Sequence, residues 1–210
     1  IGWINNSQFY TYKNQHPIWN DTNILSLSEN LQSELIIGNV RSATLNENNG
    51  IQNTHPFIHD QFIFSHNGYI ENFENESKIR LIEIIENKFL KSIKGNTDSE
   101  YIFFLFLQCF EYEKDILLAI KETVAILKSI CTKFLLNILL GYITPKNRIK
   151  LYATRIGLNS KAPTLYFRKD TNNNGYYISS EKMDSYKWIK PKNYSLLEVS
   201  EDSVKVSFIK

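Results

Sequence analysis

Two apolar runs of strand length end in polar groups that can bind a ligand. The run 35–40 is followed by Arg41, and the run 62–64 leads into residues 66–68, which are His, Asn and Gly. Both runs are rich in β-branched or aromatic residues, as buried strands are. A rigid sheet fixes the groups at a strand's end and can aim them at one ligand. Arg41 must meet an anion or solvent there, because an unpaired buried charge costs several kcal/mol, and its planar fork suits a carboxylate.

Each of these polar groups also has an interpretation without chemistry. Arg41 can form an ordinary surface salt bridge. The pair Asn67-Gly68 is typical of a tight turn, although a turn can also bind a ligand. The stretch 97–100 can form a capping box at the start of a helix, where Asp98 suits the helix dipole. Spacing alone leaves both interpretations open.

The surrounding sequence contains four short motifs in a fixed order. They are Arg41-Ser42-Ala43-Thr44, Thr54-His55-Pro56-Phe57, His66-Asn67-Gly68 and Thr97-Asp98-Ser99-Glu100. In this order and at these distances they resemble the class II glutamine amidotransferases, N-terminal-nucleophile hydrolases that hydrolyse the side-chain amide of glutamine. The resemblance covers nearly the whole chain and implies one domain over residues 1–210. The implied fold is α+β, a four-layer αββα sandwich with antiparallel sheets.

The resemblance also implies a role for each motif. Asn67, through its side-chain amide, and Gly68, through its backbone N–H, are expected to form the oxyanion hole. Arg41 is expected to hold the α-carboxylate of glutamine, and Asp98 to accept from its α-ammonium group. Thr44 and His55 are further expected substrate-binding residues. The substrate is then glutamine or another γ-glutamyl amide, and no cofactor is expected.

The family nucleophile is a cysteine at the mature N-terminus, with its free α-amino group nearby as base. That residue is not in this chain, so we expect the N-terminal segment and its first strand to be missing and the chain alone to be inactive. Cys109 and Cys131 lie in apolar helical runs and are expected to be core thiols. Such thiols fit a reducing, cytoplasmic compartment.

Several kinds of enzyme and one kind of binding protein remain open. The closing segment 178–199 is similar to the end of short stand-alone members, including those that trim γ-glutamyl from an ergothioneine precursor. Leu45 stands where the large synthases carry a histidine, which argues against a synthase. A γ-glutamyl hydrolase is the second enzymatic hypothesis. The alternative is a catalytically silent domain that senses glutamine or serves as a scaffold, and any partner enzyme or homo-oligomer stays open.

Composition excludes other classes. The net charge of +2 gives no footprint for nucleic acid or an acidic membrane, and no apolar window reaches the length of a membrane span. His55 and His59 are four residues apart, but Pro56 argues against the helix that would make them metal ligands. We therefore expect no metal site.

The elements expected to position these residues follow from apolar periodicity. Residues 1–13 predict a hairpin, 21–32 a short helix, and 35–41 and 61–65 two core strands, with Asn67-Gly68 as a turn. Helices are predicted over 74–90, 97–110 and 114–129. Six strands are predicted after them, over 134–142, 150–154, 164–168, 175–179, 196–199 and 204–209. Strands, then helices, then strands favour layered α+β over a doubly wound sheet.

Overall fold

The computed structural model describes residues 1–40, 50–171, 175–200 and 203–209. Within these ranges the strands form a six-stranded sheet, ordered β11-β10-β7-β6-β5-β4, and two small sheets, ordered β2-β1-β3 and β8-β9. Every ladder between these strands is antiparallel. The strands are β1 (Gly2–Asn5), β2 (Gln8–Thr11), β3 (Ile36–Ile37), β4 (Phe57–His59), β5 (Phe62–Ile70), β6 (Phe134–Ile143), β7 (Ile149–Leu158), β8 (Tyr166–Asp170), β9 (Gly175–Ser179), β10 (Ser195–Val199) and β11 (Val204–Phe208).

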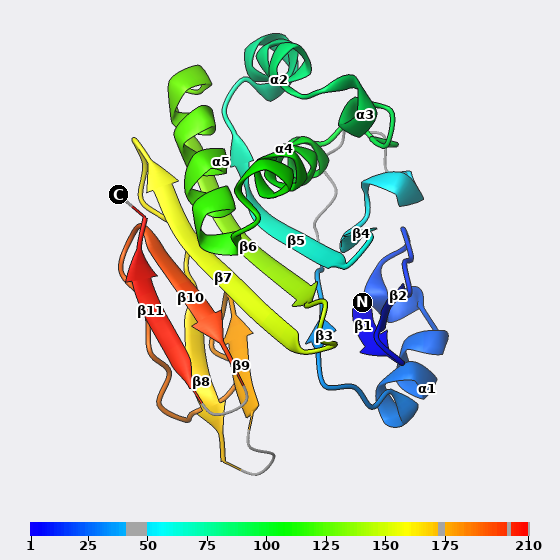
Figure 1. The fold of residues 1–210 in the computed structure, drawn as a ribbon. Coiled ribbons are helices and arrows are strands. Elements are labelled where there is room, and N and C mark those ends of the chain that lie inside the picture. The colour runs from blue at the N-terminus through cyan, green and yellow to red at the C-terminus, as the bar shows by residue number, and fades with distance from the viewer. Residues whose placement is uncertain (41–49, 172–174, 201–202, 210) are drawn as a thin grey trace.

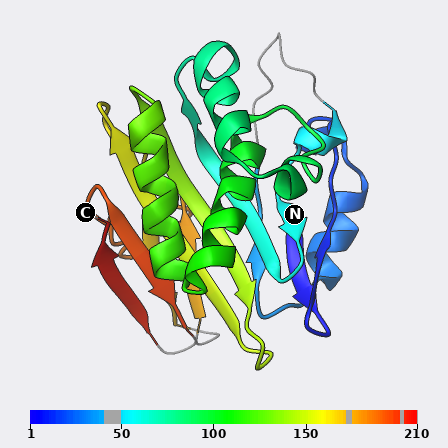
Figure 2. The ribbon, with the colours of Figure 1, turned by 45° about the horizontal axis from the view of Figure 1, so that its top comes forward.

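The two long helices and the small sheets lie on opposite faces of the six-stranded sheet, while α1 lies beside β1 and β2 (Figure 1). Helices α4 and α5 cover one face, and β3, β8 and β9 lie behind the other (Figures 1 and 2). The helices are α1 (Asn23–Asn30), α2 (Lys78–Ile84), α3 (Asn87–Leu90), α4 (Asp98–Glu113) and α5 (Ile116–Ile130). The α+β class with stacked antiparallel sheets, predicted from the sequence, is confirmed.

Alternation along β5 divides its side chains between the two faces. Phe62 and Phe64 belong to the large apolar core under α4 and α5, while Ile63 packs with Leu35 and Ile37 from the side of the small three-stranded sheet. Successive strand residues point to opposite faces. The same alternation therefore places Ser65 and Asn67 on the face away from the helices.

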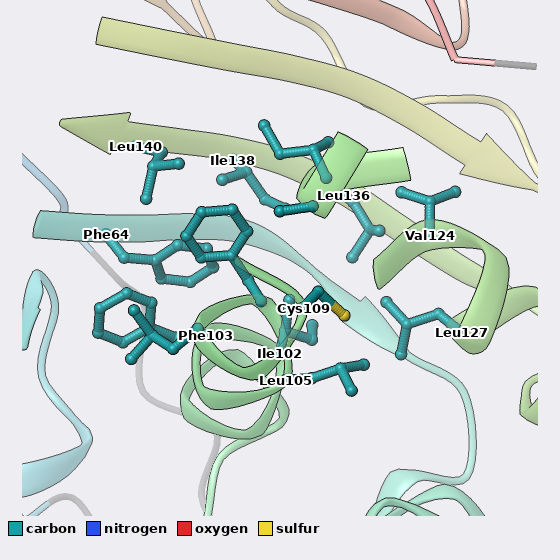
Figure 3. Packing of buried hydrophobic residues seen from close by; sticks show 14 of the residues in the cluster. Phe64, Ile102, Phe103, Leu105, Cys109, Val124, Leu127, Leu136, Ile138 and Leu140 are labelled. Carbon is teal, nitrogen blue, oxygen red and sulfur yellow. The ribbon is translucent and has the colours of Figure 1, made fainter. Parts of the chain in front are cut away.

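The core between α4 and the sheet is aromatic. Phe64 stacks on Phe103 of α4 with ring centroids 4.9 Å apart, and Figure 3 shows the two rings beside each other. The sulfur of Cys109 lies among the same apolar side chains (Figure 3), and Cys131 is also buried. Burial raises the pKa of both thiols, because a thiolate is poorly solvated in an apolar core. Both cysteines therefore have the core role expected of them.

The helix ends follow from their capping residues. Thr97 accepts a hydrogen bond from the N–H of Glu100 at the start of α4, and Asp115 accepts from the N–H of Leu118 at the start of α5. The Glu100 carboxylate accepts from the N–H groups of Lys94 and Gly95. It therefore holds the loop before the helix, and only half of the expected capping box forms as such.

Three local expectations were wrong. The strand predicted over 35–41 is short: β3 spans Ile36–Ile37, it pairs with β1 in the small three-stranded sheet, and residues 38–40 are not in a strand. The helix predicted over 74–90 is broken after Ile84, because the Gln108 side chain receives the N–H of Glu86 and donates to the carbonyl of Ile84. Asn67-Gly68 is not a turn: β5 continues through both residues to Ile70 and pairs with β6. The pairing of nine β5 residues with β6 stabilises the extended conformation more than the local preference of Asn-Gly stabilises a turn.

Candidate functional site

A cleft of about 2330 Å³ opens beside β5 and the start of α4. Four residues expected from the sequence line it: Asn67 and Gly68 of β5, Asp98 of α4, and His55 of the loop before β4. The structure thus brings together residues that lie up to 43 positions apart in the chain. Two further expected residues, Arg41 and Thr44, lie outside the described residues, so their roles stay predictions.

The two residues of the expected oxyanion hole differ in their surroundings. Asn67 is exposed and lies on the cleft face of β5. Gly68 is crowded from behind: a Cβ placed there would overlap the backbone carbonyl oxygen of Leu135 and lie 2.7 Å from Nε2 of His66. Glycine is therefore required at 68 by the close approach of β6, while its φ is not positive.

Asp98 is fixed where β5 meets α4. Its Oδ2 accepts from the backbone N–H of Ile70 at 2.8 Å, and its Oδ1 accepts from the Ser99 hydroxyl at 3.2 Å. The carboxylate lies at the positive end of α4, which favours its charge. A carboxylate has about four acceptor positions, so after these two bonds it can still accept from a ligand's ammonium group in the cleft.

His66 joins the sheet to the same helix. Its Nδ1 lies 2.9 Å from the Ser99 hydroxyl, and its Nε2 lies 3.0 Å from the carbonyl oxygen of Leu135. The ring is buried on the helix side of β5, and the polar chain runs from β6 through His66 and Ser99 to Asp98. His66 therefore links β6 to the start of α4 and, through Ser99, to Asp98. Sequence reasoning did not single out Ser99 as part of this link.

His55 lies deeper in the wall of the cleft. It is buried, its ring packs edge-on against Phe57 with centroids 4.8 Å apart, and the bond to Pro56 is cis. His59, at the end of β4, has other neighbours: its ring contacts the ring of Phe104, and its Nε2 lies near the carboxylate of Asp60. The two rings thus have different surroundings, and within the described residues no group of three His, Cys, Asp or Glu side chains could hold a metal ion.

Sequence reasoning also missed a polar residue on the next strand. Asn137 interrupts the otherwise apolar strand β6, it is 4% exposed, and it pairs directly with Asn67 in the antiparallel register. Its polar character within an apolar strand was the one signal in the sequence.

The helices of the described part of the chain include none that is long and apolar enough to cross a membrane.

The stacked antiparallel sheets, with a polar cleft where β5 meets α4, agree with the fold that the resemblance to the N-terminal-nucleophile hydrolases implies. A glutamine aminotransferase class-II domain protein from Silicibacter pomeroyi has a similar structure, with a TM-score of 0.78 over 99% of this chain and 89% of that one. At 23% identity this likeness shows the fold. The model of the family described as Glutamine amidotransferases class-II matches residues 8–140. The chain therefore belongs to the class II glutamine amidotransferases.

A curated relative matches a shorter stretch. The chain is 40% identical over 94 residues to the probable glutamine amidotransferase DUG3 of Saccharomyces cerevisiae. The match takes in 43% of this chain and 25% of the length of that relative. Membership of this family favours an enzyme over a catalytically silent binding domain.

Proposed function

We propose that the intact protein hydrolyses γ-glutamyl amides through a cysteine acyl-enzyme, and that this chain supplies the groups that bind the substrate and stabilise the transition state. One observation carries the proposal: Asn67 and Gly68 of β5 and Asp98 of α4 line the same cleft. These residues match the motifs by which the chain resembles its family. The name of the yeast relative, a probable glutamine amidotransferase, supports the same reaction.

The substrate is held by the charges at its amino-acid end. Asp98 accepts hydrogen bonds from the α-ammonium group, and its own bonds to Ile70 and Ser99 fix the carboxylate. Arg41 binds the α-carboxylate with two parallel hydrogen bonds. Arg41 lies outside the described residues, but Asn39 and Val40, which precede it, line the cleft. The γ-amide then extends along the cleft toward Asn67.

The reaction is acyl transfer in two stages. A cysteine thiolate attacks the γ-carbonyl carbon, and the developing oxyanion accepts from the Asn67 side-chain amide and the Gly68 N–H. Preorganised donors of this kind lower the barrier because they already face the atom that becomes negative. The C–N bond breaks, the amine leaves with a proton from the cysteine's α-amino group, and a thioester remains. Water then releases glutamate.

The nucleophile comes from a segment outside this chain. Cys109 and Cys131 are buried in the apolar core, they are absent from the cleft lining, and burial raises the pKa of both. A nucleophilic cysteine needs exposure and a lowered pKa. Neither thiol meets that requirement.

The cleft has a suitable place for the strand that carries the nucleophile. Among the described residues β3 pairs only with β1, and β9 pairs only with β8, and both strands line the cleft. Leu139 of β6 lies between them, because it contacts the apolar clusters under both small sheets. A strand placed there can pair with an open edge and bury this apolar floor.

The test compares substrates and proteins in one assay of glutamate release. The intact protein should release glutamate from glutamine or from N-substituted γ-glutamyl amides, and the preferred substrate separates a glutaminase from a γ-glutamyl hydrolase. Replacing its N-terminal cysteine by alanine should abolish release, and residues 1–210 alone should release none. Equal activity of all three proteins would place the nucleophile within this chain and refute the proposal.

A further inference from the structure

Asn137 is a buried polar residue with half of its side-chain amide bonded. Its Nδ2 donates to the carbonyl oxygen of Thr164 at 2.6 Å. Its Oδ1 is buried and has no hydrogen-bond partner in the described part of the chain. A buried acceptor without a donor destabilises the protein, so we look for a donor that can reach this oxygen.

The bond to Thr164 decides which end of the amide is open. Because Nδ2 is committed to that carbonyl, Oδ1 is the end left without a partner. On one side in the register stands Arg155 of β7, which donates to the carbonyl oxygens of Pro163, Pro191 and Ala162. Each of the three guanidinium nitrogens thus donates to the loop 162–163 or to Pro191, and none of them donates to Oδ1 of Asn137.

On the other side stands Asn67 of β5, directly opposite Asn137 in the ladder. Directly opposed residues in an antiparallel pair have Cβ atoms about 4.5–5.5 Å apart, which two Asn side chains can bridge. Both residues line the cleft. No hydrogen bond joins the Asn67 side-chain amide to any described residue, so its rotamer is not fixed by a partner.

We infer that Asn137 is a positioning residue: its Oδ1 accepts one N–H of the Asn67 amide and thereby aims the second N–H at the oxyanion. A side-chain amide has two donors, so Asn67 can serve both partners at once. The inference rests on the proposed function, because the orientation of Asn67 matters only if Asn67 donates to the oxyanion in that reaction. It explains why an amide interrupts the apolar strand β6 at this register.

A double-mutant cycle on the intact protein tests the inference. Asn67→Ala should lower kcat about 100- to 1000-fold, as the loss of an oxyanion donor does. Asn137→Ala should lower kcat about tenfold, with the KM for the γ-glutamyl amide unchanged within about twofold. In the Asn67→Ala background, Asn137→Ala should change kcat by less than about twofold, because residues that act as one unit are not additive.

Nuclear magnetic resonance of side-chain amides gives a readout that does not depend on turnover. The two N–H resonances of Asn67, assigned by their absence in Asn67→Ala, should be well separated in the unsubstituted protein. In Asn137→Ala they should move together, because the hydrogen bond of one proton is lost. Should Asn137→Ala fail to fold, Asn137→Ser replaces it in both measurements, since its side chain is too short to reach Asn67.

The outcomes separate this inference from the function it rests on. An Asn137→Ala loss in kcat that is the same in both backgrounds, or unchanged Asn67 resonances, overturns the positioning role alone. An intact protein without amide hydrolysis, or an Asn67→Ala variant with unchanged kcat, overturns the proposed function as well. A thermal unfolding midpoint measured for each variant separates these effects from a loss of folded protein.

Discussion

The two faces of β5 differ in kind, although they belong to one strand. On the helix face, Phe62 and Phe64 are almost fully buried and pack on the aromatic rings of α4. On the cleft face, Ser65 receives the side-chain amide of Asn39, and Asn67 is exposed. The first face is closed by packing. The second is apolar and buried at Ile63, and it becomes polar at Ser65 and open at Asn67.

This difference shows how one strand combines stability with chemistry. The period of two separates the residues that pack under the helices from those that face the cleft. His66 is the exception, because it is a polar residue on the packed face. Its two ring nitrogens lie within hydrogen-bond distance of the Ser99 hydroxyl and the Leu135 carbonyl oxygen. Substitutions on the helix face should therefore change stability, and those on the cleft face should change activity.

The largest effect is expected on the helix face, at Phe103. Phe103 is fully buried and stacks on Phe64 (Figure 3), so Phe103→Ala should lower the free energy of unfolding by about 3–5 kcal/mol. Urea unfolding measures the loss, and the KM of the protein that remains folded should be unchanged. An unstable variant with a greatly raised KM would show that the two faces are not independent.

Gly68 is the position where the two faces meet. Gly68→Ala should lower the free energy of unfolding by about 1–3 kcal/mol and also reduce kcat, because the new Cβ pushes β5 away from the carbonyl of Leu135. The matched control is Gly38→Ala, since no heavy atom lies within 4 Å of a Cβ there. That control should stay within about 0.5 kcal/mol. Equal stability of both variants would contradict the close approach at Gly68.

The packed face could largely be predicted from the sequence, and the cleft face only in part. Apolar periodicity predicted α4, α5 and β6, because burial selects apolar residues at fixed spacing. It failed where one distant side chain decides the outcome: Gln108 ends α2 by receiving the N–H of Glu86. No local pattern contains that contact.

The candidate site residues were found by motif, and the residues that contact or oppose them were not. Asn67, Gly68 and Asp98 stand in short motifs, so their types and order were enough to bring them together. Asn137 acquires meaning only from its register opposite Asn67, and register is set by pairing between strands far apart in sequence. Ser99 likewise acquires its role from His66, 33 positions away.

On the cleft face, Asp98→Asn should leave stability nearly unchanged. It should raise the KM for the γ-glutamyl amide roughly 10- to 100-fold, because the neutral Asn side chain lacks the charge that pairs with the substrate's α-ammonium group. Steady-state kinetics of the intact protein measures this. The matched control is Asp115→Asn, which changes the N-cap of α5 and is absent from the cleft lining. If both variants raised the KM equally, Asp98 would have only a structural role.

The smallest effect is expected at Ser99, which lies between the two faces. Its hydroxyl is 2.9 Å from Nδ1 of His66 and 3.2 Å from Oδ1 of Asp98. Ser99→Ala should lower the free energy of unfolding by about 1 kcal/mol, because a buried hydrogen bond is lost. It should also raise the KM a few-fold with kcat unchanged, because Asp98 loses one of the two bonds that orient it.

The conservative variant decides what the Ser99 hydroxyl does. Ser99→Thr keeps a hydroxyl and should restore the KM, even where its extra methyl group costs some stability. Ser129→Ala serves as the control, because among the described residues that exposed hydroxyl bonds only to the carbonyl of Ile126 on α5. If Ser99→Ala lost stability without any change in KM, the hydrogen bonds through His66 would stabilise the packed face and would not affect substrate binding. The two faces of β5 would then be separate at this point too, and Asp98 would be oriented by the N–H of Ile70.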